Sequence, residues 1–156
     1  MSAPRIILNL HNEYIKDTLK GAIVQDMKVF LCNLTYTVLK GINSPVRKVY
    51  IGTKALKHNY DKRPAVEYDF LINNLHQIIK YPQIVYENKP SKRGSYCFVK
   101  SLDDVNWLCS LELVEDNQNN LATQIEIVTF FRVPKEKYLD TYTLLWSWRD
   151  DNTPSS

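Results

Sequence analysis

The segment from residue 84 to 133 constrains the fold most, because it alternates apolar and polar residues in short runs separated by turns. A basic turn occupies residues 89–94, and an amide-rich turn occupies residues 117–120. Strands bounded by such turns at regular intervals predict hairpins. We therefore expect a four-stranded antiparallel meander, with strands at residues 84–88, 95–100, 106–114 and 125–133.

Helices are expected on either side of this meander. The strand-like run Val49–Gly52 leads into a helix over residues 53–63, which the Thr53 hydroxyl would cap. Pro64 suits the first turn of a second helix, and the next break is at Tyr81-Pro82. Residues 135–148 are expected to form a C-terminal helix. The prediction is an α+β fold, with N-terminal helices packed on the four-stranded antiparallel sheet and a C-terminal helix.

The first 45 residues are interpreted as a separate N-terminal helical arm. Apolar residues recur at helical spacing from Asn12 to about Lys40, and a Gly, Asn, Ser and Pro cluster follows at residues 41–45. The β-branched and aromatic residues of 29–38 leave a strand open as the alternative there. The expected organisation is an arm at 1–45, an α+β domain at 46–149 and a disordered tail at 150–156.

Charge is distributed unevenly along the chain of 156 residues. Residues 45–63 contain six Lys or Arg and one acid, and residues 80–100 contain five Lys or Arg and one acid. Residues 101–131 contain six acids and no Lys or Arg. Two basic blocks of this kind predict a positive face for a polyanionic partner.

The cysteines and histidines argue against a metal cofactor. Cys32, Cys97 and Cys109 are odd in number and lack metal-ligand spacing, so we expect buried free thiols in a reducing compartment, the cytoplasm. The three histidines are scattered, so no cofactor is expected. No apolar stretch approaches the roughly 20 residues that span a bilayer.

The helix at residues 53–63 has a polar face with catalytic potential. Lys54, His58 and Asp61 lie at i, i+4 and i+7, and therefore share one side of the helix. A cation, an imidazole and an orienting carboxylate suit proton transfer beside a phosphate. A solvated basic surface helix is the alternative interpretation.

The order of these parts resembles the phage-type branch of the nuclease superfamily that includes barnase, EndoU, colicin tRNases and RelE toxins. The resemblance covers about residues 49–148. It is carried by the run Leu56–Arg63, the helix after it, Tyr81–Ile84, a strand ending in Lys100, and Ile127–Phe131. It implies an α+β fold and metal-independent cleavage of RNA. The RNA substrate would be single-stranded or tRNA-like, and a cognate inhibitor protein is left open as a partner.

The resemblance also implies roles for individual residues. His58 matches the histidine of the helix, Lys100 the lysine of the strand and Thr129 the late strand hydroxyl. His58 would take the proton of a ribose 2′-OH, giving a 2′,3′-cyclic phosphate, while the cations and Thr129 stabilise the phosphoryl oxygens. The residues expected to bind the substrate are Lys54, Lys57, Lys92, Arg93 and Tyr86.

One position departs from the family pattern. Arg63 stands where many relatives place a second histidine, and a guanidinium cannot shuttle protons at neutral pH. Either one histidine suffices, with Arg63 stabilising the phosphorane, or the chain is a catalytically inactive RNA- or protein-binding module of the same fold.

Overall fold

The computed structural model describes residues 3–90, 92, 94–115, 118, 121–135 and 137–149. The helices are α1 (Ala3–Leu10), which continues into a π-helical turn η1 (His11–Ile15), and α2 (Tyr36–Gly41), α3 (Thr53–Lys62) and α4 (Ala65–Lys80). The strands are β1 (Lys28–Asn33), β2 (Lys48–Gly52), β3 (Ile84–Glu87), β4 (Tyr96–Leu102), β5 (Val105–Glu115), β6 (Ala122–Arg132) and β7 (Thr143–Ser147).

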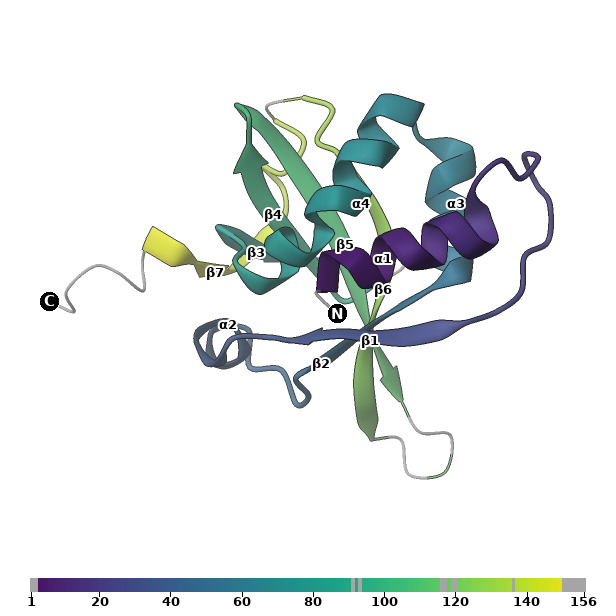
Figure 1. Ribbon diagram of the computed structural model, residues 1–156. Helices are drawn as coiled ribbons and strands as arrows, with labels where there is room; N and C mark the ends of the chain where they lie inside the picture. Colours follow the sequence, from purple (N-terminus) through teal and green to yellow (C-terminus); the bar gives the residue numbers. More distant parts are fainter. Residues whose placement is uncertain are drawn as a thin grey trace, which may run out of the picture.

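All seven strands form one mixed sheet in the order β1-β2-β6-β5-β4-β3-β7 (Figure 1). Neighbouring strands are antiparallel except β2 and β6, which run parallel. The fold is α+β, but the predicted four-stranded meander with a C-terminal helix is wrong. The four expected strands are present as β3 to β6, and the sheet extends beyond them at both edges.

The C-terminal extension of the sheet is β7, where a helix was expected. β7 pairs antiparallel with β3, opposite Val85, and buries Trp146 while Leu144 points to solvent. The residues whose spacing indicated a helix, Tyr138, Leu139 and Tyr142, pack on the sheet from the turns before β7. Pairing with the open edge of β3 outweighs the helical spacing, because an unpaired edge leaves backbone groups unsatisfied.

At the other edge, β2 and then β1 extend the sheet beyond β6, and β1 lies within the segment whose spacing indicated helices. Residues 28–33 pair antiparallel with β2, so the strand alternative is confirmed there and the helix is wrong. Ile7 and Leu10 of α1 are buried in the same core as the sheet residues Ile51 and Ile127. Residues of the first 45 therefore contribute to the sheet and to its main core. The expected tail at 150–156 lies outside the described residues.

The two faces of the sheet are covered differently. Helices α1 and α4 lie side by side over one face, where the large core includes Phe98 and Cys109 (Figure 1). The opposite face carries a smaller cluster, which includes Cys97 and Leu108. Successive strand residues thus contribute to opposite clusters, as the pleat requires. The smaller cluster leaves room for a cleft on its side of the sheet.

Two further sequence expectations concern compartment. Cys32, Cys97 and Cys109 are buried free thiols, as expected. Over the described residues, no helix combines the length and the apolar character that crossing a membrane requires.

Candidate functional site

Helix α3 is positioned by the open edge of β6. Strand β2 pairs with β6 only at Ile125 and Glu126, and the chain then leaves the sheet and turns into α3. Two side chains, from Asn59 in α3 and from Arg63 just after its last residue, replace the missing strand at Phe130. Its N–H donates to Asn59 Oδ1 (3.0 Å), and Arg63 Nε donates to its carbonyl oxygen (2.9 Å). Satisfying this buried backbone fixes α3 and Arg63 against the sheet.

The start of α3 differs from the expected cap. Gly52 occupies the capping position and no side chain caps the helix. The Thr53 hydroxyl instead donates to the carbonyl of Gln25 (2.5 Å) and accepts from the N–H of Met27 (2.9 Å). Thr53 therefore attaches the loop before β1 to α3, and the capping prediction is wrong.

Arg63 is held in one orientation by a small polar network. Its Nη2 donates to Thr129 Oγ1 (2.8 Å), and Thr129 Oγ1 donates to Asn59 Oδ1 (2.9 Å). The Asn59 amide is fixed in turn, because Nδ2 donates to the Ala55 carbonyl (2.7 Å). The Thr129 proton is thus directed to Asn59, and the hydroxyl acts as a support for the guanidinium.

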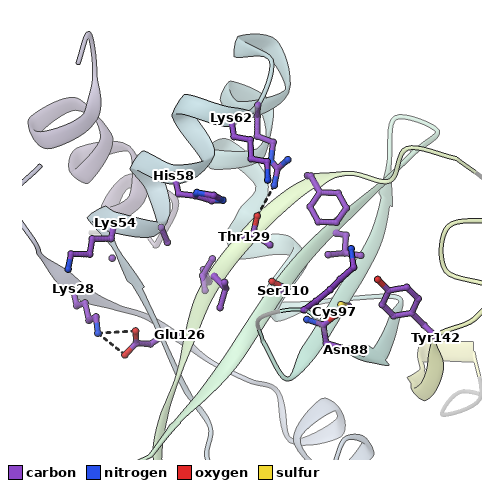
Figure 2. Close-up of a pocket in the computed structure, with 18 of the residues that line it drawn as sticks. Lys28, Lys54, His58, Lys62, Asn88, Cys97, Ser110, Glu126, Thr129 and Tyr142 are labelled. Atoms are coloured by element: carbon purple, nitrogen blue, oxygen red, sulfur yellow. Dashed lines mark hydrogen bonds and ion pairs between the residues drawn. The ribbon is translucent and has the colours of Figure 1, made fainter. Parts of the chain in front are cut away.

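A cleft of about 770 Å³ opens between α3 and the sheet face that carries the smaller cluster. His58 is exposed and points from α3 towards β6 in this cleft, beside Thr129 (Figure 2). Arg63 and Thr129 line the same cleft. The structure therefore brings together three of the four residues expected to act in catalysis.

The charges around the cleft are paired at one end and unpaired at the other. Lys28 forms an ion pair with Glu126 (2.9 Å), and Lys54 lies 3.5 Å from Asp26. The other cations that line the cleft, Lys62, Arg63 and Lys92, form no ion pair within the described residues. That end is therefore positive, and an anionic group is the natural ligand.

Burial shapes the chemistry of two lining residues. It lowers the pKa of Arg63 from its ordinary value, but a guanidinium remains a cation at neutral pH. Burial raises the pKa of the Cys97 thiol to about 12, so this thiol stays protonated at neutral pH. Cys97 is accordingly a wall of the cleft and no nucleophile.

Lys57 and Asp61 lie on the other side of α3, away from the cleft lining. Lys57 is buried and donates from Nζ to the carbonyl of Leu19 and to Asp61 Oδ1, both at 2.6 Å. Asp61 Oδ2 accepts from the N–H of Gly21 (3.0 Å). The Lys57 hydrogen bond is the main cause of the lowered Asp61 pKa. This pair attaches the loop before β1 to the helix.

Lys100 also lies away from the cleft. Its Nζ donates to the Tyr81 carbonyl (2.6 Å), and it lines a separate cavity together with Trp146 and Trp148. Burial lowers its pKa. The structure thus separates Lys100 from His58, with which the resemblance grouped it.

The remaining expected residues divide between the cleft and its surroundings. Lys92 lines the cleft, and its Nζ donates to the Tyr138 hydroxyl (3.1 Å). Tyr86 is half-buried behind the cleft, with its ring 6.2 Å from that of Tyr142. Arg93 lies outside the described residues.

Sequence reasoning missed two polar residues of this site, Asn59 and Ser110. Asn59 lies four residues before Arg63, a spacing that places two side chains on the same side of a helix. That spacing was the signal available in the sequence. Ser110 is buried in the cleft floor and lies opposite Thr129 in the sheet. No local pattern reveals this, because strand register decides it.

Within the described ranges, no three His, Cys, Asp or Glu side chains gather in a metal-binding arrangement. Comparison of the chain with protein-family models, curated proteins and solved structures gave no match. The chemistry of the cleft is therefore the basis for assigning a function.

Proposed function

We propose that this protein binds RNA in the cleft and cleaves it as a metal-independent endoribonuclease, leaving 2′,3′-cyclic phosphate ends. The observation that carries the proposal is the placement of the exposed His58 in one cleft with the fixed guanidinium of Arg63. Lys62 and Lys92 supply further positive charge there. An imidazole beside preorganised cations is the combination that phosphoryl transfer from a ribose hydroxyl needs.

The reaction follows from these positions. His58 accepts the proton of the 2′-OH, and the 2′-oxygen attacks the adjacent phosphorus as the bond to the 5′-oxygen breaks. The leaving 5′-oxygen takes a proton from solvent or from the protonated His58. Arg63 stabilises the charge that develops on the phosphoryl oxygens, and Asn59 and Thr129 position Arg63. A general base contributes about 10²–10⁴-fold to the rate.

The direct test is incubation of the purified protein with single-stranded RNA in EDTA. Cleavage with cyclic phosphate at the new 3′ ends is expected, and an RNA with 2′-deoxyribose at every position should bind and stay intact. Cleavage of the deoxyribose strand would contradict the mechanism, because it has no 2′-OH to attack.

A non-catalytic RNA-binding module is the second candidate. It is favoured by the position of Lys100 outside the cleft and by Arg63, which cannot transfer protons. This alternative predicts binding that weakens steeply as salt rises while the RNA stays intact in every buffer. The same EDTA experiment therefore distinguishes the two candidates.

A further inference from the structure

The floor of the cleft contains a buried hydroxyl that has no hydrogen-bond partner in the described part of the chain. Ser110 is 2% exposed, and its Oγ has no hydrogen-bond partner among the described residues. Figure 2 shows Ser110 on the sheet below the cleft opening, between Thr129 and Cys97. Leaving a buried hydroxyl unpaired costs free energy, so a native structure that does so calls for an explanation. A ligand that reaches the floor would supply the missing partner.

Aromatic and apolar side chains line the same cleft as this hydroxyl. The rings of Phe131 and Tyr138 lie edge to face at 5.9 Å, and those of Tyr138 and Tyr142 are also 5.9 Å apart. All three rings line the cleft, as do Cys97 and Leu108. A neutral hydroxyl among aromatic rings suits a flat, uncharged group with polar edges better than it suits a phosphate.

Gly94 lies close to Ser110 and Asn88. A Cβ on Gly94 would lie 3.5 Å from Ser110 Oγ and 3.2 Å from Asn88 Nδ2. Gly94 also has φ +110°, a conformation that other residues rarely adopt. The missing side chain thus permits this close approach. Ser110, Asn88 and the three aromatic rings line one part of the cleft, here called the recess (Figure 2).

This recess adjoins the proposed reaction site. Ser110 is the cross-strand partner of Thr129, which accepts the hydrogen bond of Arg63, so the two side chains stand on the same sheet face. We propose that the recess between Ser110, Asn88 and the three aromatic rings binds one nucleobase of the RNA, with the Ser110 hydroxyl bonded to the base edge. This inference rests on the proposed function. Protein side chains read RNA bases in the same way, by stacking and by edge hydrogen bonds.

The test measures binding of non-cleavable dinucleotides in EDTA by calorimetry. Each carries a 2′-O-methyl group at the cleavage site and one of the four bases, or no base, on one side of the phosphate. The wild type should prefer one base over the abasic dinucleotide. Ser110→Ala should lose about two- to tenfold of that preference, the value of one neutral hydrogen bond, with unchanged affinity for the abasic compound. Ser101→Ala, the same change on an exposed part of β4, should change nothing.

Three results would overturn the inference. The first is that the wild type binds all four bases and the abasic compound equally. The second is that folded Ser110→Ala keeps the base preference of the wild type. The third is that Ser110→Ala loses affinity for the abasic compound, which would mark a phosphate site. The wild-type comparison needs no variant, and Ser110→Cys provides a second substitution of similar size if Ser110→Ala does not fold. Base preference with no cleavage of ordinary RNA would reject the nuclease and keep the base site. Cleavage without base preference would keep the nuclease and reject the base site.

Discussion

The two sides of helix α3 each carry ionisable side chains, but in different environments. On one side, Lys57 and Asp61 bond to each other and to the loop before β1, and the Lys57 side chain is only 7% exposed. On the other side, His58 and Lys62 are exposed and line the cleft beside Arg63. The first pair holds the fold together, and the second set is available to a ligand. Partners and burial separate these roles, whereas residue type does not.

The largest expected effect belongs to His58. His58→Ala should lower the rate of RNA cleavage by about 10²–10⁴-fold, because it removes the proposed general base. Because the side chain is exposed, the melting temperature should change little. The matched control is His76→Ala on α4, which should leave the rate unchanged, since His76 does not line the cleft. Equal rates for both variants would remove His58 from the mechanism.

Arg63→Lys should lower the cleavage rate by about 10²-fold. The positive charge remains, but the fork that donates to both Thr129 and the Phe130 carbonyl is lost, so the charge is no longer fixed in place. Lys100→Met is the comparison, and single-turnover rates measure both. Because Lys100 lies in a separate cavity, its replacement should leave the rate unchanged. A large loss in Lys100→Met alone would reverse the assignment.

The two lysines of α3 should respond to substitution in opposite ways. Lys57→Met should lower the free energy of unfolding by about 2 kcal/mol, because it leaves Asp61 and the Leu19 carbonyl without their donor. RNA affinity at low salt should not change. Lys62→Met should keep its stability but bind RNA more weakly, with a salt slope smaller by about 1. Urea unfolding and salt-dependent RNA binding measure the two effects.

The smallest expected effect concerns pH. The Asp61 pKa is lowered from 3.8, so the folded state favours the carboxylate. Its contribution to stability is present above pH 3.8 and is lost as the pH falls through the lowered pKa. Asp61→Asn should therefore be less stable than the wild type by about 1 kcal/mol or less at pH 7, because the pair is partly solvated. A difference that stayed constant down to pH 2 would contradict this origin.

The strongest local patterns predicted parts of the fold. Alternation and polar turns predicted strands β3 to β6, and Pro64 together with the break at Tyr81-Pro82 predicted α4. Strand β7 was missed, and β1 was left as an alternative to a helix, because short apolar runs fit the period of a helix as well as that of a strand. Pairing partners distant in sequence decide between the two.

The same limit applies to the candidate site. His58 and Arg63 were found because both belong to one short segment. Lys100 was grouped with them because the face of a strand residue cannot be read from sequence without its register. Lys100 lies two residues after Phe98, so its side chain is on the sheet face of the large core. Cys97 faces the cleft on the opposite side. Thr129 reaches the cleft because a bulge at Val128 shifts the register of β6 relative to β5.

RNA bound as proposed would occupy the cleft side of α3. The most direct measurement is an amide NMR titration of the full chain with a 2′-O-methyl oligonucleotide in EDTA. The largest shifts are expected at residues 58, 62, 63 and 110, with little change at Lys57 and Lys100. Shifts concentrated around Lys100 and Trp148, with the cleft residues unmoved, would contradict it.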